Sequence, residues 1–204
     1  MTLLPLFPLP NVVLFPGALL PLHIFEPRYR AMTADALEGD RRLGMVLLQP
    51  GWETDYDGRP PIFPVGCSGV IVYSTELEDG RYNIVLRGLD RFRVVNEDHG
   101  RPYRRAEIEV MPDRPLDDDE RAELADLRAT LATLLGSAYV EPLPSMPDAE
   151  LVHTLAQTLD FEPIEKQALL ERENLSLRAR SLVELIEMKK LMATMPPSLP
   201  RQRH

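Results

Sequence analysis

The residue types that could carry chemistry are few in this chain, and they stand apart from one another. The four histidines are isolated in sequence: His23, His99, His153 and His204. No H-E-x-x-H or comparable metal-ligand spacing is present. The single cysteine, Cys67, lies at an expected strand start, where a small buried residue is a simpler interpretation than a reactive thiol. We therefore expect no catalytic residues, no metal site and no cofactor.

The motifs for nucleophilic catalysis and phosphate binding are also missing. The sequence has no G-x-S-x-G elbow, and no lysine follows a glycine as a P-loop requires. Two charged groups leave alternatives open. The acidic run Asp117 to Glu120 could bind a divalent cation, although a solvated helix start explains it more simply. Arg87, Arg91 and Arg93 could form an RNA-binding patch, or they could lie on strand faces toward water.

One long loop, Gln49 to Pro61, contains the single tryptophan, Trp52, together with Tyr56. A long loop that carries aromatic side chains is typical of a recognition surface. The alternative is that the tryptophan folds back as a lid on the core. Trp52 and Tyr56 are our candidate recognition residues.

Composition and charge restrict the class of protein. The chain has 204 residues, of which 44% are hydrophobic and 27% charged, and these values are ordinary for a globular domain. The net charge of −9 argues against a general binder of nucleic-acid backbones. Proline or charge interrupts every long apolar run, and the N-terminus lacks a basic n-region. We expect a cytoplasmic protein with no membrane association.

The elements that would position these residues change in kind along the chain. Ten of the eleven glycines lie in the first 100 residues, among short apolar runs, and this predicts a β unit over residues 1–116. We expect about six strands, enough to close a small barrel, and one inserted helix from Pro27 to Gly39. Three strand features are specific predictions: a strand at Val12–Phe15, a buried strand at Leu43–Leu48, and a hairpin turning at Asp79-Gly80.

The remainder has the periodicity of helices. About four apolar stripes predict a helical bundle over residues 117–195, and residues 196–204 should form a disordered tail. Ser145 with Asp148 resembles a capping box, and Ser176 could cap the last helix. In that helix five residues should share the buried face: Ala179, Leu182, Leu185, Ile186 and Met192.

Two segments resemble the N-terminal, substrate-binding domain of Lon proteases, the ATP-dependent protease La family. Residues 4–17 read LPLFPLPNVVLFPG and continue over 20–30 as LPLHIFEPRYR, which is similar to the start of that domain. Residues 79–94, DGRYNIVLRGLDRFRV, resemble its hairpin. The likeness covers roughly Leu3 to Met192. It implies an α+β fold: a PUA-like barrel followed by the helical bundle.

The resemblance also implies a function. In Lon proteases this region helps to capture unfolded or tagged polypeptides, whereas the ATPase and peptidase domains lie downstream. We therefore expect a stand-alone, non-catalytic module that binds extended polypeptide segments or a specific protein partner, as an adaptor or regulator in protein quality control. It should be a monomer or a weak dimer, and any peptidase label would be inherited from the family name. The alternative is an RNA-binding PUA-like protein, which would need a basic stripe on the folded surface.

Overall fold

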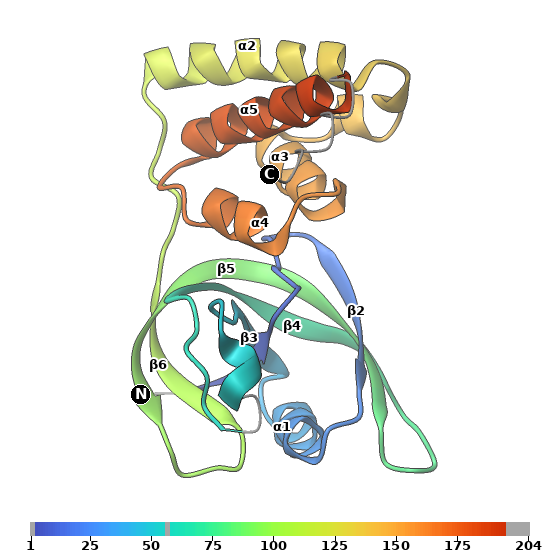
Figure 1. Ribbon diagram of the computed structural model, residues 1–204, viewed down its shortest axis with the longest axis vertical. Coiled ribbons are helices and arrows are strands. Elements are labelled where there is room, and N and C mark those ends of the chain that lie inside the picture. Colours follow the sequence, from blue (N-terminus) through green and yellow to red (C-terminus); the bar gives the residue numbers. More distant parts are fainter. Residues whose placement is uncertain (1–2, 56–57, 195–204) are drawn as a thin grey trace, which may run out of the picture.

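A computed structural model defines residues 3–55 and 58–194 of the chain. The fold is α+β: a mixed sheet is followed by a helical region, with one helix inserted between the second and third strands (Figure 1). The strands are β1 (Leu4–Leu9), β2 (Leu19–Ile24), β3 (Arg42–Leu47), β4 (Val65–Glu76), β5 (Tyr82–Asp98) and β6 (Arg104–Val110). The α-helices are α1 (Pro27–Glu38), α2 (Asp118–Leu135), α3 (Asp148–Thr158), α4 (Pro163–Leu170) and α5 (Leu175–Thr194). Short 3-10 helices lie at Trp52–Asp55, Gly136–Ala138 and Leu143–Ser145.

The sheet closes on itself because β5 is long enough to serve two neighbours. The strand order is β2-β5-β4-β3-β1-β6, with β1 and β3 parallel and the other pairs antiparallel. The first part of β5, Tyr82–Arg87, pairs with β2, whereas Phe92–Asp98 pairs with β6. Since β6 also pairs with β1, five strands form a closed ring, which we call the barrel. The predicted α+β class, with six strands and one inserted helix, is confirmed.

The beginning of β5, the end of β4 and β2 together extend beyond the ring as a three-stranded sheet, which we call the arm. Its hairpin end projects from the side of the barrel that faces away from the helical bundle (Figure 1). The inner face of the arm carries Ile71, Ile84 and Leu86, and these side chains join the core together with Tyr29 and Met32 of α1. The arm is therefore held in place by α1 on one face.

One predicted strand of the β unit was wrong, and the other local features differ from the expectation only in detail. Val12–Phe15 is irregular backbone, because Gln157 of α3 takes the hydrogen bonds that a neighbouring strand would take. The predicted hairpin at Asp79-Gly80 is confirmed, and its loop has three residues, of which Gly80 alone takes a positive φ, 77°. α1 ends at Glu38 with Gly39 as its C-cap, and the left-handed residue that follows is Arg41, with φ 62°.

Within the described residues, the helical region contains four α-helices, α2 to α5, as predicted. α2 begins with a complete capping box between Asp117 and Glu120, so the acidic run is a helix start. The predicted caps of α3 and α5 were wrong: Pro147 precedes α3 without a side-chain bond, and Asn174 caps α5 by accepting from the Leu177 amide at 2.9 Å.

The prediction for α5 was also partly wrong. Ala179, Leu182 and Ile186 are buried, whereas Met192 is 65% exposed and Leu185 is half-buried. At 100° per residue, Met192 points well away from the core-facing side. No described helix is both long and apolar enough to cross a membrane. The boundary at residue 116 stays a prediction, and the predicted tail lies outside the described residues.

Candidate functional site

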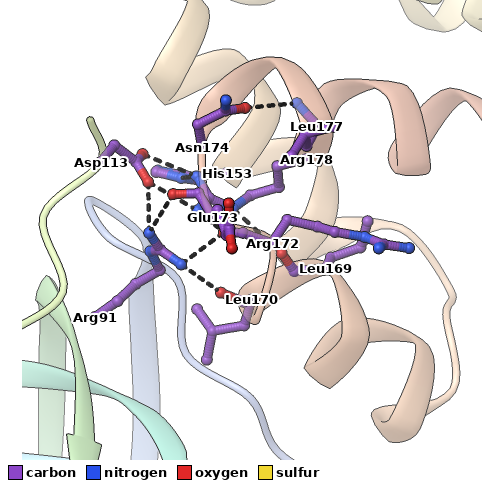
Figure 2. Close-up of polar contacts among 10 residues, drawn as sticks. All are labelled: Arg91, Asp113, His153, Leu169, Leu170, Arg172, Glu173, Asn174, Leu177 and Arg178. Atoms are coloured by element: carbon purple, nitrogen blue, oxygen red, sulfur yellow. Dashed lines mark hydrogen bonds and ion pairs between the residues drawn. The ribbon is translucent and has the colours of Figure 1, made fainter. Parts of the chain in front are cut away.

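The densest group of buried charges lies where the barrel meets the bundle (Figure 2). Arg91 of β5 and Arg178 of α5 have side chains that are 3% and 0% exposed. Both bind Asp113, which lies between β6 and α2: Arg91 Nη2 is 2.6 Å from Asp113 Oδ1, and Arg178 Nη1 is 3.0 Å from Asp113 Oδ2. We call these three residues and His153 the junction cluster.

The two guanidinium groups also donate hydrogen bonds to backbone carbonyl groups. Arg91 donates to the carbonyl oxygens of Leu170, Arg172 and Glu173 at 2.7–3.1 Å. Arg178 also donates to the Arg172 carbonyl, at 3.0 Å. These carbonyls lie at and just beyond the C-terminal end of α4, where the helix dipole favours positive charge. The positive charges of the two buried arginines are thus compensated by one carboxylate and by the C-terminal end of α4.

The protonation states follow from this arrangement. Burial, and then the charge of Arg178, lower the pKa of His153 to about 4. The ring is therefore neutral at pH 7, and its Nε2 accepts a hydrogen bond from Arg178 Nη1 at 3.0 Å. Burial alone would raise the pKa of Asp113, but the bond to Arg178 and the two positive charges outweigh burial and lower that pKa.

The junction cluster joins the two parts of the fold and brings no nucleophile to a reacting position. Arg91 was expected to face water, and this expectation was wrong, because the side chain crosses from β5 into the bundle. Cys67, which pairs with Arg91 in the sheet, is fully buried, and burial raises the pKa of its thiol to about 12. The thiol therefore stays protonated, as expected of a structural cysteine.

The outer face of the arm carries the best candidate for a binding surface. In β2 the exposed residues alternate, so that Leu19, Pro21 and His23 point to the same side, and Phe25 continues the row. Pro21 pairs with Val85 of β5, and Val85 pairs with Tyr73 of β4. An apolar row therefore crosses all three strands.

Large apolar side chains on this face are unusually exposed. Leu19 is 60%, Phe25 58% and Tyr73 57% exposed. Between the strands Pro21, Tyr73 and Val85 line a shallow hollow of about 340 Å³. Contiguous exposed apolar surface of this kind is typical of a site that binds another molecule.

Polar groups border the hairpin end of the outer face. His23 Nδ1 is 2.7 Å from Asn83 Oδ1, and Arg81 Nη1 is 3.2 Å from His23 Nε2. Since arginine donates only, Nε2 accepts and Nδ1 carries the proton that is donated to Asn83. His23 is thus a hydrogen-bonded surface residue. The border offers groups that can bond to a peptide backbone.

Trp52 lies elsewhere, at the boundary between barrel and bundle. It is half-buried in a 3-10 helix and lines a hollow of about 250 Å³ together with Phe63 and Pro163. Its role in recognition stays a prediction. Tyr56 lies outside the described residues.

The sequence reasoning missed Leu19, Phe25 and Tyr73 as candidate binding residues. The sequence pattern could have predicted the first two, because exposed residues alternate with core-facing ones from Leu19 to Phe25. Tyr73 follows a shift in strand register between Ile71 and Tyr73, and the local sequence pattern does not predict this β-bulge. Over residues 3–55 and 58–194, no three His, Cys, Asp or Glu side chains are grouped so that they could hold a metal ion.

Comparisons with known proteins agree with this architecture. Residues 3–188 match the family model described as the ATP-dependent protease La (LON) substrate-binding domain. The chain is 31% identical over 199 residues to Lon protease 2 of Myxococcus xanthus and 30% identical over 199 residues to a Lon protease of Anaeromyxobacter dehalogenans. Each match covers 92% of this chain but 24% and 23% of the relative, respectively. The chain thus spans about a quarter of the length of these relatives.

Two solved structures share the fold. The N-terminal domain of a Mycobacterium avium complex Lon protease has a TM-score of 0.73 and 17% identity, and the match covers 91% of this chain and 98% of that one. A Lon N-terminal domain protein from Xanthomonas campestris has a TM-score of 0.61 and 24% identity, covering 96% and 100%. With the family model matched over nearly the whole described chain, this protein belongs to the family of ATP-dependent protease La (Lon) substrate-binding domains.

Proposed function

We propose that this protein is a non-catalytic module that binds unfolded or extended polypeptide segments through the outer face of the arm. The observation that supports it most is the apolar row formed by Pro21, Val85 and Tyr73, flanked by the exposed Leu19 and Phe25. A folded binding partner buries most of its apolar side chains in its own core, whereas an unfolded polypeptide exposes them. The arm can therefore select unfolded polypeptides, because apolar area is buried when the two surfaces meet. This burial contributes about 25 cal/mol per Å² to the free energy of binding.

Binding through side chains on the face is favoured over addition of a strand to the arm. β2 is an edge strand whose outer side has no strand partner among the described residues. Gly88 N donates to Ala18 O, so alternate residues from Ala18 onward face β5, and the backbone of Pro21 faces the free edge. Because proline has no N–H, a strand added there would lose a central hydrogen bond.

In a cell the module would act as an adaptor or regulator in protein quality control, either delivering polypeptides or competing for them. Membership in a substrate-binding family supports polypeptide recognition, and the family match covers no ATPase or peptidase domain. The RNA-binding alternative has less support. Twelve arginines of the described chain form ion pairs with carboxylates, which removes much of the free positive charge that RNA would need.

Fluorescence anisotropy tests the proposal with a labelled, permanently unfolded polypeptide such as reduced and carboxymethylated lactalbumin. We expect saturable binding that survives moderate salt. The double variant Phe25→Ser/Tyr73→Ser should weaken it by about tenfold or more, since buried aromatic contacts typically contribute over 1 kcal/mol each. Both side chains are largely exposed, so the variant should fold normally.

The matched control is Val95→Ser/Val140→Ser, which removes two equally exposed apolar side chains outside the arm. It should bind like the wild type. Equal loss in both double variants would refute the arm as the site. Binding of a short single-stranded RNA that weakens steeply with salt, without polypeptide binding, would replace the proposal with the RNA-binding alternative.

A further inference from the structure

Two exposed arginines lie beside the apolar row on the outer face of the arm. Leu19 of β2 pairs with Arg87 of β5. Val70 of β4 pairs with Arg87 on one side and with Arg42 of β3 on the other. Residues that pair across neighbouring strands point to the same side of a sheet, so both arginines lie on the side of Leu19, and both are exposed. We call these four residues the arginine row.

The charges of Arg42 and Arg87 are not neutralised by ion pairs within the described part of the chain. Neither belongs to the twelve arginines that bind carboxylates there. The nearest carboxylates in the sequence are Asp40 and Asp90, and Asp40 accepts a hydrogen bond from the Arg42 backbone amide at 3.1 Å. No residue of the apolar row or of the arginine row is acidic. The surface is therefore locally positive, and the net charge of −9 acts on it weakly because salt screens charges beyond about 8 Å.

The two rows are spaced like alternate residues of an extended polypeptide. Val85 of the apolar row and Arg87 of the arginine row are two residues apart on β5, which corresponds to about 6.6 Å. In an extended chain lying along β5, side chains two positions apart point to the same side with the same spacing. An apolar side chain in the hollow of about 340 Å³ beside Tyr73 therefore brings the side chain two positions away to Arg87.

We propose that Arg87 makes the arm select extended segments in which Asp or Glu lies two positions from an apolar residue. This inference rests on the proposed function and names the class of segment that the arm binds. Arg42 lies about 10 Å away, at two strand spacings, and extends the positive surface across β3. A polypeptide is favoured over RNA, because Pro21 and Val85 of the apolar row offer no aromatic face on which a base could stack.

Two labelled, isomeric peptides test the inference by fluorescence anisotropy. Each has phenylalanine at position i and leucine at i−4 and i+4. One has aspartate at i−2 and i+2 and serine at i−1 and i+1, and the other has these residues exchanged, so the direction of binding does not matter. The first peptide should bind about two- to fivefold more tightly at low salt, the effect usual for one exposed ion pair. Equal affinities at low salt would overturn the inference.

Salt and charge variants assign the preference to Arg87. The ratio of the two affinities should approach one in about 1 M salt, where the Debye length is about 3 Å. Arg87→Gln should bind both peptides equally, and Arg87→Glu should reverse the preference. Thermal denaturation checks that both variants fold, as expected for an exposed side chain.

Arg93→Glu is the matched control for these variants. Arg93 is an exposed arginine of the same strand, but it lies in the part of β5 that pairs with β6, outside the arm. This variant should keep the wild-type ratio of affinities. If Arg93→Glu and Arg87→Glu change the ratio equally, the effect comes from net charge and the role of Arg87 is refuted.

The outcomes separate this inference from the proposed function. If Phe25→Ser/Tyr73→Ser weakens binding of two peptides that the wild type binds equally, the arm is the site and the acidic preference is wrong. If neither peptide nor carboxymethylated lactalbumin binds, the proposed function fails and the inference fails with it. A single-stranded RNA that binds the wild type but not Arg87→Glu, without peptide binding, would assign the arginine row to RNA instead.

Discussion

Asp113 contacts both Arg91 and Arg178, so each of these buried cations depends on one carboxylate and on the end of α4. Replacing Asp113 with Asn keeps the shape but removes the charge. We expect the free energy of unfolding to fall by about 2 kcal/mol, a figure that is reduced because the carboxylate is 30% exposed. Chemical denaturation measures this change.

Asp148→Asn is the matched control for that prediction. Asp148 also binds an arginine, Arg128, but it is 45% exposed at the start of α3. The loss there should be about 0–1 kcal/mol, as is usual for surface pairs. If the two variants lose the same stability, the junction cluster contributes nothing beyond an ordinary surface pair.

His153 should make the stability depend on pH in a defined direction. Its pKa is lowered from 6.5 to about 4 in the folded chain, so the unfolded chain takes up this proton at higher pH than the folded chain does. The histidine therefore has no effect above about pH 6.5, and stability falls as the pH decreases toward 4, by about 1.4 kcal/mol per pH unit. Between pH 6.5 and 5 the expected loss is about 2 kcal/mol.

Denaturant midpoints of the wild type and of His153→Gln over this range check the prediction. Gln can still accept from Arg178 but does not titrate, so its curve should be nearly flat down to pH 5. Asp113 does not obscure the comparison, because its lowered pKa keeps it charged in this window. Parallel curves for the two proteins would contradict the assignment to His153.

At the scale of elements, long periodic segments were predictable and irregular ones were not. α1, α2 and α4 begin at Pro27, after Asp117 and at Pro163, because proline and capping residues act locally. By contrast, Val12–Phe15 has the composition of a strand, yet Gln157, more than 140 residues away, takes its backbone bonds. No local rule contains that information.

The candidate site shows the same limit. The alternation from Leu19 to Phe25 could have been read as an edge strand with an exposed face. The face of the arm that α1 covers is decided by packing between elements. The pairing of Tyr73 with Val85 beyond the β-bulge depends on such packing as well. Similarly, Arg91 alternates like a surface residue, and only the docking of α4 explains its burial.

At the base of the arm, Gly88 of β5 passes close to the backbone of the segment before β2. Gly88 donates to Ala18 O at 2.9 Å and accepts from Gly17 N at 3.0 Å. A Cβ at position 88 would lie 2.0 Å from the backbone oxygen of Phe15, which cannot move without breaking these bonds. Gly88→Ala should therefore lower the free energy of unfolding by about 3 kcal/mol.

Gly100→Ala is the control, because a Cβ there meets the flexible end of Arg105 at 3.3 Å. Thermal denaturation should separate the two variants clearly. A Gly88→Ala protein as stable as Gly100→Ala would show that the base of the arm is not tightly packed.

At the scale of the whole molecule, the junction cluster fixes the bundle on the barrel and leaves two apolar surfaces uncovered in different places. The outer face of the arm lies on the barrel, and the exposed side chains of Met188, Leu191 and Met192 lie on α5 of the bundle.

The central claim is that unfolded polypeptide binds the outer face of the arm, and amide chemical-shift mapping by NMR tests it most directly. The protein is titrated with an unlabelled, permanently unfolded polypeptide, and the shifted amides are assigned. We predict that the largest changes lie in β2, in Val72–Glu76 of β4 and in Tyr82–Arg87 of β5. Changes confined to the hollow beside Trp52 or to the helical bundle, with the arm unperturbed, would contradict it.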